Sequence, residues 1–593
     1  MAAGLRRFFS GPRSDLALAV VAMLLTLPAM WLTLDSDDYL QVVSLDASPG
    51  IRGLGRAPWD LYAFGRDAAS IGALREEGVW PWWADTSAVI SFFRPLASLS
   101  RWLDHAVWPH SVALMEAHSL AWFGLLLWGT SRLYRRLASL PWVAGVAFAL
   151  FALDEARAAT IAWLCNRNAL IALAFGVCAL LAHDRARSDG DRRAVWVATA
   201  CFALALLGGE GALAMFGYLA AYALFIDRGT PFRRATSLLP YLGVIAVWAV
   251  VYVSLGYGAV RSGFYIDPVR EPLLFLRVLP ERLTIYTVAM FEGVSADWYN
   301  IAPLFGWNPR PKLLPISAGL VALLCVALLP LVRRDRVARF WALGALISMV
   351  PICGTSPSDR MLTAPALGGM SLLAMLLTSL VDGTHPAPRL WVRAYAGLLA
   401  LVNLVFSPLL LPLFVAMIDD FDAALARADL TVPRAGAQDL TVVLVNPPFD
   451  TFAVFFRPYR QIYGHEQPKH FRWLATGVFD LSIERVDAHS LRVAPAPGYW
   501  ANSSQLMLRS LAHPMAQGTQ VALDGVRFEV ESLTPDGRPA KVLVRFDEPL
   551  DSPSMRLLQW DRYGYVPFRL PAIGETVVLP KVDMEAALKG PEG

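Results

Sequence analysis

Apolar segments long enough to cross a membrane recur through the first two-thirds of the chain. A transmembrane helix needs about 20 mostly apolar residues. We place eleven such segments near residues 15–34, 112–131, 142–158, 160–182, 194–208, 210–226, 238–257, 313–332, 338–354, 363–382 and 394–417. The pattern therefore predicts a multi-span α-helical membrane protein with about 11 transmembrane helices.

Arginine is concentrated in alternate segments between these spans, starting with the N-terminal leader. These segments carry 19 arginines: Arg6, Arg7, Arg13, Arg132, Arg135, Arg136, Arg185, Arg187, Arg192, Arg193, Arg228, Arg233, Arg234, Arg333, Arg334, Arg336, Arg339, Arg389 and Arg393. The positive-inside rule assigns them to the cytoplasm. With an odd number of spans, the N-terminus is then cytoplasmic and the C-terminus lies outside. The first span lacks a small-residue cleavage site, which favours a retained anchor.

Two of the outer loops are long, and the chain changes character after the last span. Residues 35–111 hold six tryptophans, a density typical of helices at the membrane interface, and residues 258–312 include an amphipathic stretch, 272–291, predicted to be interfacial or re-entrant. β-Branched, alternating segments with turn signals then follow at 440–445, 481–486, 521–530, 542–546 and 576–579. We predict a transmembrane domain (1–418), a short helix and linker (419–438) and a β-rich extracytoplasmic domain (439–593).

Composition narrows the class of protein and its compartment. The chain is 56% hydrophobic and 17% charged, too apolar for a soluble protein of 593 residues. Of its 52 basic residues, 47 are arginine, which with abundant alanine suggests a GC-rich bacterial genome and hence a bacterial inner membrane with a periplasmic C-terminal domain. Nothing indicates nucleic-acid binding. The five cysteines lie in apolar stretches without a CxxC pair, which favours buried free thiols over disulfides or a zinc site.

An acidic group directly follows the first span, in the sequence Leu34-Asp35-Ser36-Asp37-Asp38-Tyr39. Carboxylates are costly in hydrocarbon, so this group belongs at or beyond the outer interface. One hypothesis makes it the base that acts on a substrate at the outer leaflet. The other makes it the cap of a following helix, which the spacing alone favours. An acidic pair could also bind a divalent cation.

Further polar groups are predicted to gather on the same outer side. They are Asp85 and the box Phe93-Arg94-Pro95-Leu96, Glu155 and Arg167, the turn Gly209-Glu210, and the segment Asp359-Arg360 to Pro365, with His118 inside the second span. Taken singly, each of these groups has a structural explanation. Interfacial loops are polar, an arginine can bind lipid headgroups, and His118 could be a hydrogen-bonded core histidine.

The order of these groups resembles the membrane part of the protein O-mannosyltransferase superfamily, closest to its branch of TPR-linked transmembrane mannosyltransferases. The resemblance covers roughly residues 15–415: the acidic pair, the Arg-Pro box, the histidine of span two, the segment from Leu150 to Leu170, the Gly209-Glu210 turn and the Asp359-Arg360 segment. Three features depart from the family. Its His-Pro is Asp154-Glu155 here, the lysine of its Lys-Glu turn is Gly209, and a β-rich domain replaces the TPR repeats.

The resemblance implies a GT-C glycosyltransferase that moves a sugar from a polyprenyl-phosphate donor to an extracytoplasmic protein, lipid or glycan, with inversion. It implies Asp38 or Asp37 as general base, Asp38 slightly favoured. Arg360, Arg94 and Arg167 would bind the donor phosphate, and Asp85, His118, Glu155 and Glu210 would contact substrate. A divalent cation remains open in such families.

Two alternatives remain at this stage. One is a non-catalytic scaffold or carrier-binding protein of the cell envelope, and the other is a lipid-linked glycan polymerase or ligase. The sequence does not indicate the sugar, the acceptor, the carrier length, the role of the β-rich domain or the oligomeric state.

Overall fold

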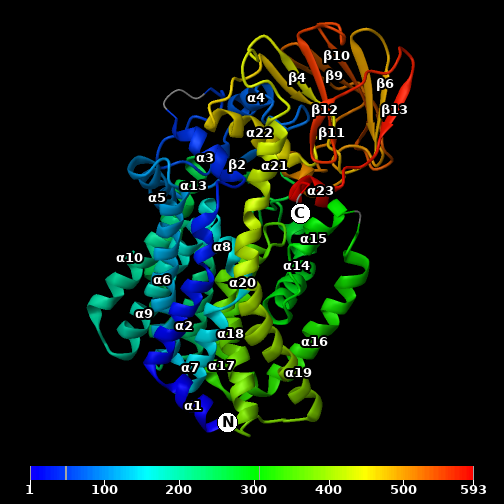
Figure 1. Cartoon of the computed structure of the whole chain (residues 1–593). Coiled ribbons are helices and arrows are strands. Elements are labelled where there is room, and N and C mark those ends of the chain that lie inside the picture. The colour runs from blue at the N-terminus through cyan, green and yellow to red at the C-terminus, as the bar shows by residue number, and fades with distance from the viewer. Residues whose placement is uncertain (1, 47–49, 306, 592–593) are drawn as a thin grey trace.

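A computed structural model describes residues 2–46, 50–305 and 307–591. A tall helical part carries the N-terminus at its lower end, and the strands of the C-terminal part lie above it (Figure 1). The main helices of the lower part are α2 (Pro12–Leu25), α6 (Val112–Leu137), α7 (Pro141–Ala152), α9 (Arg167–Ser188), α10 (Arg192–Gly208), α11 (Leu213–Phe225), α13 (Leu239–Ser254), α14 (Pro272–Glu292), α16 (Arg310–Arg334), α17 (Arg336–Ile352), α18 (Pro365–Val381), α19 (Leu390–Leu401) and α20 (Ser407–Ala416).

Within the described residues, 6 helical segments are long and apolar enough to cross a membrane: Pro12–Trp31, Val112–Leu137, Leu164–Ser188, Pro231–Ser254, Arg310–Arg334 and Leu390–Asp429. The predicted count of about eleven is not confirmed. Three further apolar helices, Pro141–Ala152, Glu210–Phe225 and Pro365–Val381, are shorter. At 1.5 Å per residue they fall short of a hydrocarbon core about 30 Å thick. Glu210–Phe225 begins in the Gly209-Glu210 turn, and Pro365–Val381 begins at the end of the segment from Asp359 to Pro365.

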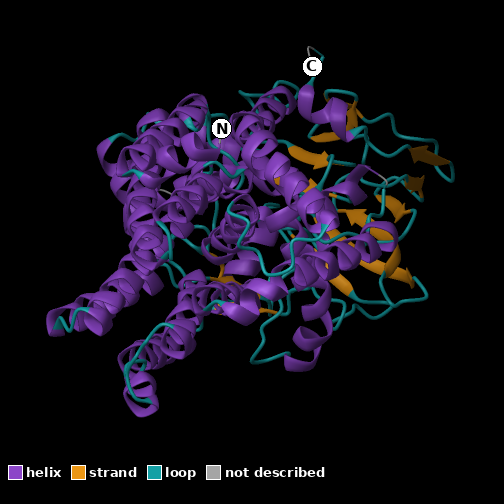
Figure 2. Ribbon diagram, turned by 90° about the horizontal axis from the view of Figure 1, so that it is seen from below, coloured by secondary structure: helices purple, strands orange, loops and turns teal. Residues whose placement is uncertain are grey.

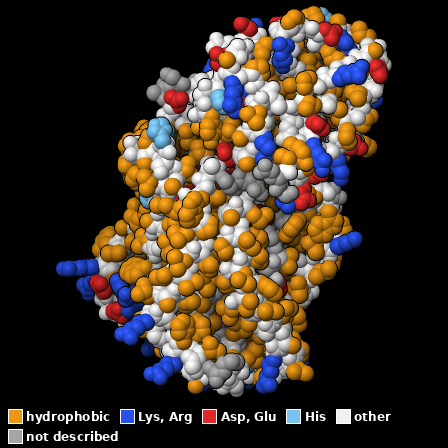
Figure 3. All heavy atoms as spheres, in the orientation of Figure 1, with side chains coloured by type: hydrophobic (Ala, Val, Ile, Leu, Met, Phe, Trp, Pro, Cys, Tyr) orange, Lys and Arg blue, Asp and Glu red, His pale blue; other side chains and the backbone are white. Residues whose placement is uncertain are grey.

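The surface of the helical part is mainly apolar on the face shown in Figure 3, and basic side chains gather at its lower end. This distribution is the one expected for a membrane protein with a basic cytoplasmic rim. All five cysteines are free thiols, as predicted, but only Cys165 and Cys353 are buried. Cys178 and Cys201 are half-buried and Cys325 is exposed, so the predicted burial is wrong for these three.

Short helices and a small sheet cover the outer end of the helical part. The helices of the first outer loop are α3 (Asp37–Leu45), α4 (Ala68–Glu76) and α5 (Pro95–Val107). Strands β1 (Ala63–Gly65) and β2 (Val89–Ser91) from this loop pair antiparallel with each other, and β2 pairs with β3 (Gly258–Val260) from the second loop. The sheet therefore fixes residues 258–260 beside β2, which immediately precedes the box that contains Arg94.

Two sheets form the C-terminal part, which Figure 2 shows to one side of the helices. The larger is antiparallel in the order β13-β6-β7-β10-β9-β8, with strands β6 (Leu481–Arg485), β7 (Ser490–Pro495), β8 (Gln520–Leu523), β9 (Val526–Leu533), β10 (Pro539–Phe546) and β13 (Thr576–Leu579). The smaller has the order β12-β11-β4-β5, with β4 (Thr441–Leu444), β5 (His470–Trp473), β11 (Met555–Asp561) and β12 (Gly564–Pro567). A short helix, α21 (Asp420–Asp429), connects this part to α20.

The smaller sheet contains a βαβ unit that the sequence analysis did not predict. Strands β4 and β5 are parallel, and helix α22 (Asp450–Ile462) connects them. A parallel pair needs such a crossover. All four residues of β4 are buried, so its sequence is a continuous apolar run rather than an alternating one.

The predicted interfacial position is wrong for Trp80, Trp82 and Trp83 of the first outer loop, all of which are buried. The ring of Trp82 stacks on Phe528 with centroids 4.9 Å apart, and Trp83 meets Trp473 edge-on at 5.0 Å. These rings bury their apolar area against the C-terminal part instead of lipid. The outer loop and the C-terminal part thus share one core.

Four of the five C-terminal aromatics Tyr459, Tyr463, Trp473, Tyr499 and Trp500 belong to the core. Tyr459, Trp473, Tyr499 and Trp500 are buried, whereas Tyr463 is 46% exposed.

Candidate functional site

A cavity of about 490 Å³ lies where the acidic turn, the small sheet and the outer ends of several helices meet. Its polar lining comes from segments far apart in the chain: Asp37, Arg94, Asn166, Asn168, Glu210, Tyr252, Tyr257, Tyr265, Asp267, Arg270, Thr355 and Arg360. Of the residues predicted for the site, the structure brings Asp37, Arg94, Glu210 and Arg360 together at this cavity.

The backbone of the acidic turn aims its carboxylates in different directions. Ser36, at the N-cap of α3, has φ +45 and ψ −115 and makes no side-chain cap hydrogen bond. A non-glycine residue in such a conformation costs about 1–3 kcal/mol, a strain that clusters at functional sites. The backbone N–H of Asp35 donates to Asp38 Oδ2 at 3.3 Å. Asp38 thus holds the turn, and Asp37 lines the cavity, with the Cys165 thiol 4.0 Å from its Oδ2.

The environment of Asp37 suits a general base. Burial raises the pKa of Asp37 to about 6, because desolvation outweighs the opposing charge of Arg360. Asp38 raises this pKa further and Arg94 lowers it. The carboxylate is therefore ionised at neutral pH, yet its pKa is close enough to the working pH for efficient proton transfer.

Three arginines line the cavity in the part of the chain that the structure describes, and they differ in their partners. Arg94 forms a bidentate ion pair with Glu210, and Arg270 lies 3.7 Å from Asp267. Arg360, in the short helix Asp359–Thr363, stacks over the ring of Trp163 at 4.8 Å and makes no ion pair with a described residue. Its guanidinium is therefore the one most available to an anionic ligand.

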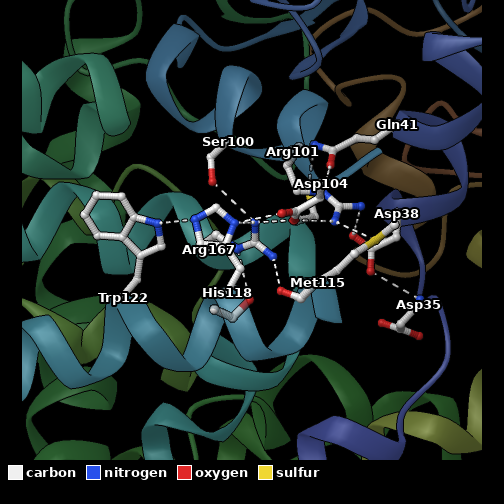
Figure 4. A network of polar contacts seen from close by, with 12 residues as sticks. Asp35, Asp38, Gln41, Ser100, Arg101, Asp104, Met115, His118, Trp122 and Arg167 are labelled. Carbon is white, nitrogen blue, oxygen red and sulfur yellow. Dashed lines mark hydrogen bonds and ion pairs between the residues drawn. The ribbon is translucent and has the colours of Figure 1, made fainter. Parts of the chain in front are cut away.

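Asp38, Arg167 and His118 belong to a largely buried polar network (Figure 4), and none of the three lines the cavity. Arg101 Nη2 lies 3.6 Å from Asp38 Oδ1 and its Nη1 lies 3.7 Å from Asp104 Oδ2. Arg167 forms an ion pair with the same Asp104 and donates to the backbone oxygen of Met115 at 2.5 Å. Negative and positive groups thus alternate along the network, which lets four charged side chains remain buried.

His118 lies at the end of this network. Its Nδ1 lies 2.7 Å from Asp104 Oδ1, and Trp122 Nε1 donates to its Nε2 at 3.1 Å. Because the indole N–H can only donate, Nε2 carries no proton, and Nδ1 donates to Asp104. These two hydrogen bonds hold His118 in place, although its side chain is 23% exposed.

Asp85 and Glu155 also lie outside the cavity lining. Asp85 pairs with Arg261 at 2.7 Å, and its backbone N–H donates to the oxygen of Leu508, so it connects the first outer loop to the C-terminal part. Glu155 follows α7, and its backbone N–H donates to Ser407 Oγ at 3.0 Å.

Arg101 and Asp104 are the residues that sequence reasoning missed. Their i, i+3 spacing on α5 was visible, but on an amphipathic helix that spacing usually marks an exposed ion pair. Within the described residues, no group of three or more His, Cys, Asp or Glu side chains is arranged to hold a metal ion. Asp38 is already engaged with Arg101, so the acidic pair does not fit a cation, and no step below uses one.

Comparison with solved structures finds matches of low similarity, among them the following two. The archaeal oligosaccharyltransferase AglB from Archaeoglobus fulgidus, in complex with an inhibitory peptide and a dolichol-phosphate, has a TM-score of 0.41 and 12% identity over 77% of this chain and 64% of that one. ArnT from Cupriavidus metallidurans, in the apo state, has a TM-score of 0.36 and 16% identity over 75% and 83%. This chain thus spans less than two-thirds of AglB. No protein-family profile and no curated sequence matches it. The O-mannosyltransferase branch is not confirmed.

Proposed function

We propose that the protein is a membrane glycosyltransferase of the GT-C type, which moves a sugar from a polyprenyl-phosphate donor to an acceptor outside the cytoplasm. One observation carries the proposal: Asp37 and Arg360, a base and a cation without an ion-pair partner among the described residues, line the same cavity. The predicted topology would place this cavity at the outer face of a bacterial inner membrane, below a periplasmic C-terminal domain.

The proposed reaction is a single displacement. Asp37 removes the proton from the acceptor hydroxyl as its oxygen attacks the anomeric carbon. The bond from that carbon to the phosphate oxygen breaks, and the electron pair remains on the phosphate. Arg360 stabilises this growing negative charge with a guanidinium fork that matches phosphate oxygens. Attack opposite the leaving group inverts the anomeric centre.

The geometry changes which residues we propose as base and as phosphate ligands, compared with those that the family resemblance implied. Asp37 replaces the slightly favoured Asp38 as the proposed base, because Asp38 is engaged by Arg101 and the turn. Arg360 remains the proposed phosphate ligand. Arg167 is withdrawn, because it is buried against Asp104 away from the cavity. A non-catalytic scaffold would not need the base Asp37 and the cation Arg360 on one cavity. A glycan polymerase or ligase would use the same chemistry and would differ only in its acceptor.

Arg360→Lys tests the proposed phosphate contact. Lysine keeps the charge but replaces a bidentate fork with a single ammonium group. We expect donor affinity to fall about tenfold, the loss of roughly one charge-assisted hydrogen bond of about 1.5 kcal/mol. The measurement is binding of a polyprenyl-phosphate sugar to purified protein in nanodiscs. Arg270→Lys, on the same cavity but next to Asp267, is the matched control and should change affinity less. Equal effects in both variants, or none in either, would remove Arg360 from the site.

The rate of transfer should depend on pH through Asp37. The base works only when ionised, and burial places its pKa at about 6. Single-turnover transfer should be level above pH 7 and fall about tenfold per unit once the pH drops below 6. Arg360→Gln removes the charge that lowers this pKa, so the midpoint should move upward in that variant. A midpoint near 4, or one that Arg360→Gln leaves in place, would contradict the assignment.

A further inference from the structure

We propose that Arg94, Glu210 and Asn168 form a wall of the cavity that binds hydroxyl groups of the donor's sugar. The inference rests on the proposed function. It assigns Arg94, which the sequence grouped with the phosphate ligands, to a different part of the substrate.

The first ground is the ion pair itself. Arg94 Nε donates to Glu210 Oε2 at 2.9 Å, and Nη2 donates to Oε1. The guanidinium also stacks on the rings of Tyr62 and Phe92, with centroids 4.9 and 4.7 Å away. Burial lowers the pKa of Arg94, but the Glu210 carboxyl raises this pKa by more, so the guanidinium remains protonated. Two aromatic contacts and a bidentate partner hold Arg94 in one position.

The second ground is the hydrogen-bonding capacity that remains. Each oxygen of Glu210 uses one lone pair on Arg94 and keeps another, so the pair still accepts hydrogen bonds. The Nη1 group of Arg94 forms no hydrogen bond to a described residue and can donate. A sugar hydroxyl both donates and accepts, and so matches this mixture. A phosphate only accepts, and the carboxylate of Glu210 would repel it.

The third ground is Asn168, which lies on the same wall. It is 8% exposed, lines the cavity, and its Oδ1 has no hydrogen-bond partner among the described residues. An unsatisfied buried carbonyl costs about 1–3 kcal/mol unless a ligand satisfies it. A hydroxyl donor from a sugar would do so.

Gly209 makes this arrangement possible. A Cβ at residue 209 would lie 3.0 Å from Asn168 Nδ2 and 3.9 Å from Arg94 Nε. A side chain there would crowd the amide against its neighbours. The family's lysine at this turn would add a cation to the wall, whereas glycine leaves it neutral overall, as suits an uncharged sugar.

The test compares two lipids, a polyprenyl phosphate that carries the sugar and the same polyprenyl phosphate without it. Binding of each to purified protein in nanodiscs is measured for wild type, Glu210→Gln and Asn168→Ala. We expect each variant to bind the sugar-bearing lipid at least tenfold more weakly, the loss of about one hydrogen bond. Binding of the sugar-free lipid should be unchanged in Asn168→Ala and unchanged or tighter in Glu210→Gln.

Two controls keep the test decisive. Asn168→Ala removes an atom without a partner, so it should fold even if Glu210→Gln, which disturbs Arg94, does not. Asn166→Ala is the second control. Asn166 lies on the same cavity, but its amide donates to the backbone oxygen of Ala159 at 3.3 Å. This variant should leave the affinity for both lipids unchanged. Equal loss of both lipids in the wall variants would overturn the sugar assignment and leave the proposed function standing. Wild-type protein that binds neither lipid would overturn both.

Discussion

Asp37→Asn should lower transfer by about 10²–10⁴-fold, the usual cost of removing a general base, while the protein stays folded. Asparagine has nearly the same size and cannot take a proton at neutral pH. Among the described residues, the Asp37 side chain accepts from the Cys165 thiol at 4.0 Å, a weak contact that an asparagine oxygen can keep. The measurement is single-turnover transfer from a polyprenyl-phosphate sugar, with thermal unfolding of the same preparation.

Asp38→Asn is the matched control at the neighbouring position. It removes one of the two carboxylates beside Arg101 but keeps a side-chain oxygen that can accept from the backbone N–H of Asp35. We expect a larger loss of stability than in Asp37→Asn and a smaller loss of rate. If folded Asp38→Asn loses more activity than Asp37→Asn, then Asp38 is the base. If both retain near-wild-type transfer, the acidic turn is structural and the assignment of the base to Asp37 or Asp38 is wrong.

Asp104→Leu should destabilise the protein by about 3–5 kcal/mol, the range for breaking a buried ion pair from one side. Asp104 is fully buried and faces both Arg101 and Arg167, and it also accepts from His118. The substitution leaves two guanidinium groups in the interior with too few negative partners. Thermal or denaturant unfolding in one detergent measures the effect.

Asp551→Leu provides the comparison for this stability prediction. Asp551 also pairs with an arginine, Arg485, but its side chain is 65% exposed. Solvent screens such a pair, and its loss should cost about 0–1 kcal/mol. Similar changes in the two variants would show that the network around Asp104 contributes no more than a surface ion pair. A strong loss in Asp104→Leu alone supports a structural role for Arg101, Arg167 and His118.

Several features of the molecule could be predicted from the sequence because they depend on local pattern. The long apolar segments indicated a helical membrane protein, and the alternating segments after residue 439 indicated a β-rich C-terminal part. The position of the acidic turn directly after the first span followed from the cost of carboxylates in hydrocarbon. Free cysteines followed from composition and spacing.

Only the tertiary structure decided which polar residues meet. Local sequence cannot distinguish Asp37 from Asp38, because the direction of each carboxylate depends on the strained Ser36 turn and on Arg101 from α5. Nor can it separate Arg94 from Arg360, because ion pairing joins residues far apart in the chain, as Arg94 and Glu210 show. Trp82 and Trp83 are buried for the same reason: their partners Phe528 and Trp473 lie hundreds of residues away. The hydrophobic pattern indicates which segments are apolar enough to enter a membrane. A functional site depends on long-range contacts, which the pattern does not encode.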